Sequence, residues 1–232
     1  MTFSSTFGDR DEIALKTTRM LLEIDAVRFD ADRPFMFTSG IASPVYIDCR
    51  RIISYPRIRA ALMDFAVATV LRDAGFQRFD AVAGGETAGI PFAAWIAAEM
   101  GLPMQYVRKR AKGFGRAAQV EGRLKDGERV LLVEDLTTDG GSKIRFCEAL
   151  RRAGAEVGHA LVLFQYDIFP QTRTRLAEHG LTLHSLATWR DVFTLCSEEN
   201  RFDPAVLAEV DAFLSDPLRW SGNHGGASEI MI

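Results

Sequence analysis

The sequence predicts an α/β fold in which a central, mainly parallel sheet carries helices on both faces. Short apolar runs typical of buried strands alternate along the chain with longer segments whose apolar residues recur at helical spacing. Parallel strands need helical crossovers, which cover both faces of the sheet, so this alternation favours a parallel sheet. At 232 residues with 47% hydrophobic side chains, the chain is long enough for one such domain.

The first elements indicate a small region ahead of the sheet. Apolar residues at mostly helical spacing predict one helix over about 10–26 and another over about 55–74. We divide the chain into an N-terminal region of about 1–50 and a core of about 51–200.

Strands and helices alternate from residue 81 onwards. The expected strands cover residues 81–83, 104–107, 130–133, 157–164 and 181–186. The expected helices cover residues 89–100, 142–153, 170–179 and 204–214. We see no internal repeat and no second core, so residues 1–216 form one domain and 217–232 a flexible tail. Sheets of this type bind ligands at the carboxyl ends of their strands.

Composition excludes several classes of protein. A net charge of −3 disfavours general nucleic-acid binding, and no apolar stretch is long enough for a membrane helix. The N-terminus lacks the pattern of a secretory signal. The three cysteines, Cys49, Cys147 and Cys196, are widely spaced and include no CxxC pair, which is typical of reduced thiols in a cytoplasmic protein.

The segment from Glu134 to Ser142 carries the clearest chemical signal. It joins the carboxyl end of an expected strand to the start of an expected helix. Two adjacent carboxylates there can accept hydrogen bonds from paired ribose hydroxyls, and N–H groups at a helix start can bind a phosphate. The pattern predicts a site for a phosphorylated sugar. The alternative is a polar turn in which Ser142 merely caps the helix.

A cationic segment from Arg108 to Arg116 follows the strand expected at 104–107. It holds five Lys and Arg residues in nine positions and no acid. Such a loop can close over a pyrophosphate and stabilise the charge of a leaving group; the alternative is a solvated loop. Residues 113–118 also match a loose dinucleotide fingerprint, but no clear amphipathic helix follows, which disfavours a nicotinamide cofactor.

A third loop, from Ala83 to Pro91, also lies at a junction between a strand and a helix. Its glycines permit close backbone approach, so it can form a second anion site. The alternative is a tight turn that leads into a helix with Pro91 in its first turn.

Together these motifs resemble the orotate phosphoribosyltransferases, a family of type I phosphoribosyltransferases. Residues 134–142 resemble the family's motif for 5-phosphoribosyl-1-pyrophosphate (PRPP), and residues 35–48 resemble its early segment with Ser-Gly-x-x-Ser-Pro-x-Tyr. Residues 83–91 resemble its pyrophosphate-side loop, and 106–122 its mobile catalytic loop. The resemblance implies a type I phosphoribosyltransferase fold in which residues 1–50 form a hood.

The resemblance also implies a role for each motif. Arg108, Lys109 and Lys112 act in catalysis and bind the pyrophosphate, beside the loop residues Thr87, Ala88 and Gly89. Ribose is held by Glu134 and Asp135. The PRPP site is completed by Leu136, Thr137, Thr138, Asp139, Gly140, Gly141 and Ser142. Orotate is bound by Thr38, Tyr46, Ile47 and Thr138.

The implied reaction joins N1 of orotate to C1 of PRPP, which releases pyrophosphate and gives orotidine 5′-monophosphate for pyrimidine (UMP) biosynthesis. Mg²⁺ is the implied cofactor, held by substrate oxygens and water without a direct protein ligand. The resemblance further implies a homodimer in which the catalytic loop reaches the partner's active site.

The chain departs from the family pattern at four places. Phe114 stands where many members have His, and Thr38 where some have Lys. Residues 164–167 stand where some carry a base-binding Arg, and Asp139 replaces a small or hydroxyl residue. Thr38 and residues 164–167 leave open how the orotate carboxylate is neutralised, and Asp139 leaves open which way its side chain points. Because Phe114 cannot transfer a proton, we expect catalysis either to rely on Lys112 and its neighbours or to be slower.

Two alternative functions remain at this point. One is a phosphoribosyltransferase for another nucleobase, which is favoured if the segment from Thr38 to Asp48 forms no pocket for a carboxylated pyrimidine. The other is a non-catalytic sensor of sugar phosphates, which Phe114 favours. The retained cations of residues 108–112 disfavour the sensor, because a sensor has little use for a loop that closes over pyrophosphate.

Overall fold

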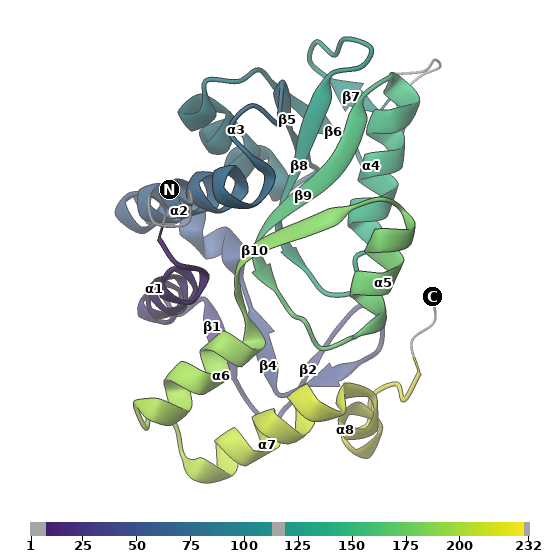
Figure 1. The fold of residues 1–232 in the computed structure, drawn as a ribbon. Helices are drawn as coiled ribbons and strands as arrows, with labels where there is room; N and C mark the ends of the chain where they lie inside the picture. The colour runs from purple at the N-terminus through teal and green to yellow at the C-terminus, as the bar shows by residue number, and fades with distance from the viewer. Residues whose placement is uncertain (1–7, 113–118, 230–232) are drawn as a thin grey trace.

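The central sheet confirms the predicted α/β class. The structure is a computed structural model that describes residues 8–112 and 119–229. In the central sheet, six strands lie in the order β10-β9-β8-β5-β6-β7. All neighbouring pairs are parallel except the one between β6 and β7 (Figure 1). The strands are β5 (Ala81–Gly85), β6 (Met104–Val107), β7 (Val120–Glu121), β8 (Arg129–Thr137), β9 (Glu156–Gln165) and β10 (Thr182–Thr188).

Helices cover both faces of the sheet, as the sequence predicts (Figure 1). One face packs against α1 (Arg10–Glu23), α2 (Pro56–Ala74) and α3 (Gly89–Met100). The other packs against α4 (Gly141–Ala153) and α5 (Gln171–Glu178). Side chains of β8 alternate between these faces, since Leu131 and Val133 join the first cluster and Leu132 the second.

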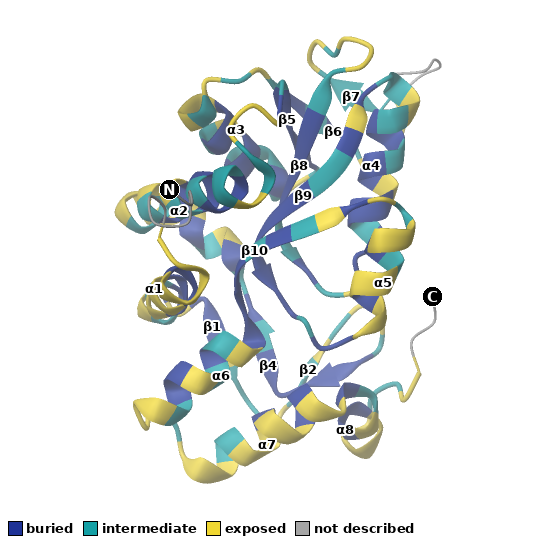
Figure 2. Ribbon diagram, viewed as in Figure 1, coloured by how far each residue is buried: buried dark blue, intermediate teal, exposed yellow. Residues whose placement is uncertain are grey.

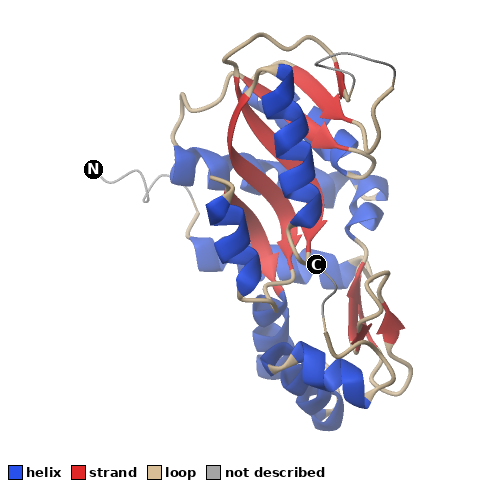
Figure 3. Ribbon diagram, turned by 90° about the vertical axis from the view of Figure 1, so that its right-hand side faces the viewer, coloured by secondary structure: helices blue, strands red, loops and turns tan. Residues whose placement is uncertain are grey.

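A small region of short strands forms the hood. In it, β1 (Val27–Phe29) pairs with β4 (Val45–Ile47), and β2 (Phe35–Met36) pairs with β3 (Ala42–Ser43), both antiparallel. The 3₁₀ helix η2 (Cys49–Ser54) links the hood to α2. Figure 3 shows the hood strands apart from the central sheet, with the last helices of the chain beside them. Figure 2 shows that the inner strands of the sheet are largely buried.

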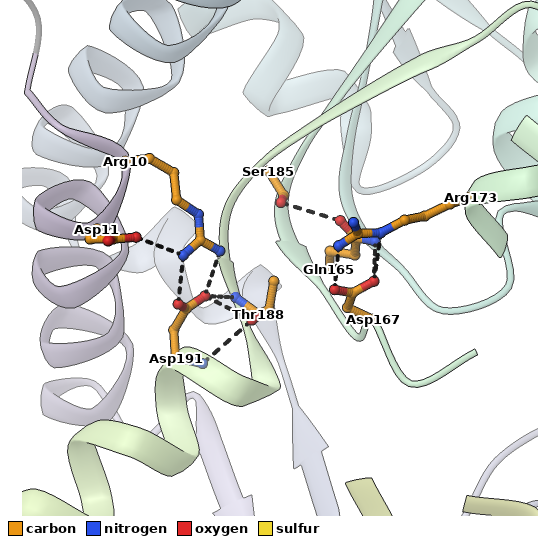
Figure 4. A network of polar contacts seen from close by, with 8 residues as sticks. All are labelled: Arg10, Asp11, Gln165, Asp167, Arg173, Ser185, Thr188 and Asp191. Carbon is orange, nitrogen blue, oxygen red and sulfur yellow. Dashed lines mark hydrogen bonds and ion pairs between the residues drawn. The ribbon is translucent and has the colours of Figure 1, made fainter. Parts of the chain in front are cut away.

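Between β10 and residue 229 the structure describes three helices, of which the sequence predicts only the middle one. They are α6 (Trp189–Glu198), α7 (Pro204–Ser215) and α8 (Pro217–Asn223). The helix α6 begins with a capping box between Thr188 and Asp191, and Asp191 also pairs with Arg10 of α1 (Figure 4). The segment expected as a tail from residue 217 begins with α8, whose Trp220 is buried.

The strand β8 also runs further than its apolar pattern. Glu134 to Thr137 continue the strand because they pair with β9 as far as Thr137 and Gln165. The predicted acids therefore belong to the end of a strand rather than to a free loop. Among the described residues, no helix combines the length and apolar character that crossing a membrane requires.

Candidate active site

Three predicted motifs meet at the carboxyl edge of the sheet. The strands β8, β5 and β6 are direct neighbours, although β5 and β6 precede β8 in the chain. Their carboxyl ends carry the acid motif, the loop after Gly85 and the cationic segment after Val107. Because parallel strands end at the same edge, these three segments form one candidate site.

The side chains of the two acids at the end of β8 have different surroundings. Glu134 is buried and contacts the first turn of α4. Asp135 lies near the hood. Burial raises the pKa of the Cys49 thiol there, and the charge of Asp135 raises it further. Burial also raises the pKa of Asp135 itself, against the opposing effect of the Lys143 ammonium. The end of β8 therefore joins the α4 face of the sheet to the hood.

The loop between the acids and α4 bends at Gly140, whose φ is +78°. That left-handed conformation suits glycine and leads directly into the helix. Ser142 lies inside the first turn and donates a hydrogen bond to Oε2 of Glu134 at 2.9 Å. The structure shows no side-chain cap at the start of α4, so the alternative that Ser142 merely caps this helix is wrong.

The orientation of Asp139 bears directly on phosphate binding. Its side chain is exposed, and Oδ1 accepts a hydrogen bond from the backbone N–H of Gly141 at 3.3 Å. The carboxylate thus faces an N–H that the predicted phosphate would use. The carbonyl of Thr138 accepts a hydrogen bond from Thr172, while Thr137 is buried and its hydroxyl has no partner in the described part of the chain.

A buried lysine, Lys143, is the site residue that sequence reasoning missed. Its side chain is 4% exposed, and its ammonium lies 2.6 Å from Oε2 of Glu134. It also donates to the carbonyl of Leu136 and contacts the hydroxyl of Ser142. A signal was present, because a cation in the first turn of a helix opposes the helix dipole and so implies an acidic partner.

The loop after β5 fits closely against the acid motif. A Cβ at Gly89 would overlap the carbonyl oxygen of Val133, and a Cβ at Gly85 would stand 2.8 Å from Cγ of Glu134. Glycine is therefore required for the approach. Thr87 is exposed and Ala88 is half-buried at the turn into α3, where the Glu86–Thr87 peptide bond is cis. The loop of Thr87, Ala88 and Gly89 therefore lies beside the acid motif, and its contact with pyrophosphate stays a prediction.

The cationic segment is anchored to this same loop. The backbone N–H of Lys109 donates to Oε2 of Glu86 at 2.6 Å, a contact the sequence did not predict. Arg108 pairs with Glu121 at 3.3 Å, and its buried Nε has no partner among the described residues. Lys109 and Lys112 are exposed. The predicted loop residue Phe114 lies outside the described residues.

Three of the predicted orotate residues lie in the hood, and the fourth, Thr138, follows the end of β8. Thr38 is exposed at the turn between β2 and β3. Tyr46 is half-buried on β4, with its ring 5.4 Å from that of Phe35 and its hydroxyl 3.3 Å from Arg50. Ile47 is only 1% exposed as a whole residue, because it lies on β4 inside the core.

The end of β9 shows what replaces the base-binding arginine of some family members. Tyr166 is buried against Trp189 and Phe37, with ring centroids 5.6 Å apart in both pairs. Asp167 forms an ion pair with Arg173 of α5 and accepts a hydrogen bond from Gln165 (Figure 4). This segment is therefore a packed link between the sheet and the hood.

Metal-binding groups are sparse. Within residues 8–112 and 119–229, no group of three or more His, Cys, Asp or Glu side chains could hold a metal ion. Mg²⁺ would instead take the phosphate oxygens of a bound donor and water, since it keeps part of its water shell, while Glu134 and Asp135 would hold the sugar of that donor.

Comparisons with known proteins identify the family of this chain. Residues 54–195 match the family model described as the phosphoribosyl transferase domain. The orotate phosphoribosyltransferase of Roseobacter denitrificans is 58% identical over 216 residues, covering 93% of this chain and 96% of the relative. The protein of that name from Rhizobium meliloti is 55% identical over 230 residues, covering 99% of each chain.

Solved structures show the same similarity. The orotate phosphoribosyltransferase of Aeropyrum pernix superposes with a TM-score of 0.67 at 33% identity, over 80% of this chain and 99% of that one. The UMP synthase of Leishmania donovani superposes with a TM-score of 0.74 at 32% identity, over 87% of this chain and 42% of that one. The convergence of three motifs on one edge of the sheet agrees with this similarity. The family model and the relatives together show that this chain belongs to the orotate phosphoribosyltransferases of the phosphoribosyl transferase domain family.

Proposed function

We propose that this protein transfers the phosphoribosyl group of PRPP to orotate, which gives orotidine 5′-monophosphate and pyrophosphate for pyrimidine (UMP) biosynthesis. The observation that carries the proposal is the convergence of the acids of β8, the start of α4 and the cations after β6 at one edge of the sheet. The names of the nearly full-length relatives support orotate as the acceptor.

The donor fits the site in three parts. Glu134 and Asp135 accept hydrogen bonds from the ribose hydroxyls, and the N–H groups of residues 138–142 bind the 5′-phosphate. The exposed Lys109 and Lys112 and the unpartnered Nε of Arg108 bind the pyrophosphate. The loop of Thr87, Ala88 and Gly89 offers its backbone on the same side.

The hood supplies the acceptor side. Tyr46 offers an aromatic face to the planar ring of orotate, and Thr38 and Thr138 offer hydrogen-bonding groups. Ile47 completes this side as the buried neighbour of Tyr46 on β4. Cleavage of the C1–O bond builds positive charge on the ribose and negative charge on the departing pyrophosphate. N1 of orotate then bonds to C1. The cations of residues 108–112 stabilise the leaving group in this step.

We include Mg²⁺ as the cofactor of this reaction. No protein side chain binds it directly; the pyrophosphate and ribose oxygens of the donor and water hold it, and the acid pair and the cationic segment hold the donor. When bound, the ion neutralises part of the pyrophosphate charge.

We also propose that the active protein is a homodimer and that it is located in the cytoplasm. The exposed apolar side chains of Ile53 and Tyr55, where η2 meets α2, support a further protein contact. In the dimer, Lys112 acts in the active site of the partner subunit. The three cysteines are free and buried, which supports a reducing compartment.

The test is an orotate absorbance assay with PRPP and Mg²⁺. We expect the wild type to consume orotate only when both are present, and Lys112→Ala to lower kcat by at least about 100-fold through the loss of leaving-group stabilisation. Lys16→Ala, which removes an exposed lysine of α1 away from the site, is the matched control.

Other outcomes of this assay have defined meanings. Consumption of adenine, hypoxanthine or uracil in place of orotate would identify a different acceptor. PRPP binding without turnover of any base would identify a sensor. For the dimer, mixing Lys112→Ala with Glu134→Gln restores activity only if one intact site forms between two differently inactivated subunits; no recovery would refute shared sites.

A further inference from the structure

The buried cation of the donor site has a function of its own. We infer that Lys143 is a positioning residue that holds Glu134 in the orientation in which it accepts a ribose hydroxyl. The inference deepens the proposed function and rests on it, because it takes the ribose of the donor as the ligand of Glu134.

The hydrogen bonds of Glu134 divide its carboxylate into two ends. Oε2 accepts from the hydroxyl of Ser142 at 2.9 Å and lies 2.6 Å from the ammonium of Lys143. Among the described residues, the structure gives Oε1 no partner. One oxygen is therefore fully engaged by α4, and the other is free for a ligand.

Lys143 is itself held in place from two sides. It donates to the carbonyl of Leu136, at the end of β8, and contacts the hydroxyl of Ser142. These two hydrogen bonds and the ion pair with Glu134 give the ammonium three polar neighbours. A lysine that is 4% exposed and engaged in this way cannot rotate out to solvent. Lys143 thus connects β8, which carries the acids, to α4, whose N-terminus faces the proposed phosphate site.

The neighbouring strand also approaches Glu134 closely. A Cβ at Gly85 of β5 would stand 2.8 Å from Cγ of Glu134. The side chain of Glu134 is thus confined both by the backbone of β5 and by the Lys143 ammonium. With the rotamer fixed, binding a ribose hydroxyl costs little further side-chain entropy.

The charge of Lys143 also fits this function. Glu134 and Asp135 are adjacent acids in a largely buried place, and two such charges repel each other. The ammonium compensates one of them without occupying the free oxygen. A stabilising function alone would not require a lysine at the start of a helix, where the helix dipole disfavours a cation.

A double-mutant cycle tests this inference by measuring the binding of Mg²⁺-PRPP by calorimetry in the absence of orotate. We expect Lys143→Met to weaken donor binding about tenfold, the loss typical of one charge-assisted hydrogen bond. In the presence of Glu134→Gln, the same Lys143→Met replacement should change donor binding less than twofold, because its effect passes through Glu134. Lys125→Met, an exposed lysine in the loop before β8, is the matched control.

Each outcome decides the question. Donor binding by Lys143→Met within twofold of the wild type would overturn the inference, as would an equal loss in both backgrounds. If Lys143→Met alone does not fold, the double variant is compared with Glu134→Gln, in which the Lys143 ammonium keeps its hydrogen bonds to Leu136 and Ser142. A difference in donor binding of more than twofold between these two variants would overturn the inference. Steady-state kinetics of Lys143→Met give a second readout. We expect the KM for PRPP to rise while the KM for orotate stays constant. Failure of the wild type to bind PRPP would count against the proposed function instead.

Discussion

At the scale of single residues, the candidate site is built from charges in unusual places. A lysine stands in the first turn of α4, and an acid, Asp139, stands in the loop proposed to bind a phosphate. The lysine opposes the helix dipole, which favours anions at a helix N-terminus. Asp139 agrees with the dipole but would repel a bound phosphate. The lysine is compensated by Glu134, whereas Asp139 is exposed and accepts only the N–H of Gly141.

Replacing Asp139 with Asn should strengthen donor binding. The carboxylate competes with the 5′-phosphate for an N–H group and repels its charge, whereas an amide keeps the hydrogen-bond acceptor without the charge. We expect KM for PRPP to fall by about threefold to tenfold, with the largest effect at low salt.

Steady-state kinetics at two ionic strengths measure this change. Asp9→Asn, which removes an exposed acid ahead of α1 that makes no capping hydrogen bond, is the control. A KM for PRPP that stays constant or rises in Asp139→Asn would show that this carboxylate does not face the phosphate.

At the scale of elements, the contact between α2 and α3 carries a pair of acids. Burial raises the pKa of Glu99 to about 7, and the charge of Asp64 adds to this effect. Between about pH 4.5 and pH 7, the folded protein therefore binds a proton that the unfolded chain releases. The stability associated with this group is fully present at low pH and is lost as the pH rises through about 7.

Glu99→Gln should therefore stabilise the protein at pH 8 and leave its stability nearly unchanged at pH 5. The amide resembles the protonated carboxyl group that the pair prefers and can still donate a hydrogen bond to Asp64. Urea unfolding midpoints at both pH values measure the difference. The control is Glu23→Gln, an exposed acid at the end of α1. An equal gain at both pH values would contradict the assignment.

At the scale of the whole molecule, the last residues fasten the hood. Ser221 of α8 is fully buried, accepts the N–H of Ala42 at 2.9 Å and donates to the carbonyl of Ala227 at 2.6 Å. The N–H of Ala227 in turn donates to the carbonyl of Gly40 at 2.8 Å. The predicted orotate residue Thr38 lies in the turn that these contacts hold.

Ser221→Ala should lower the free energy of unfolding by about 1–3 kcal/mol, because it leaves the buried N–H of Ala42 without a partner. It should also raise KM for orotate more than KM for PRPP, since the hood turn loosens while the end of β8 does not. Thermal unfolding and the two KM values measure both effects. Ser228→Ala, an exposed serine further along, serves as the control. An equal rise in both KM values would refute a local effect on the hood.

How much was predictable depends on how local each signal is. The helix from 89 to 100 and the strands at 104–107 and 157–164 follow from apolar periodicity within a few turns of chain. The helix α6 escaped prediction although it starts at a capping box, and α8 is short and lies in a glycine-rich end. The chemistry of the acid motif was clear because its residues are consecutive, whereas the Glu86 contact with Lys109 spans 23 positions.

The sequence by itself determined the α/β class, the position of the acid motif at the start of a helix and the likeness to the orotate phosphoribosyltransferases. Periodicity and short motifs express local geometry, so a linear chain suffices to show them. Only the tertiary structure placed β5 between β8 and β6, enclosed Lys143 against Glu134 and returned Ser221 to Ala42, 179 positions away. These contacts depend on strand order and on packing between distant segments, which no local pattern encodes.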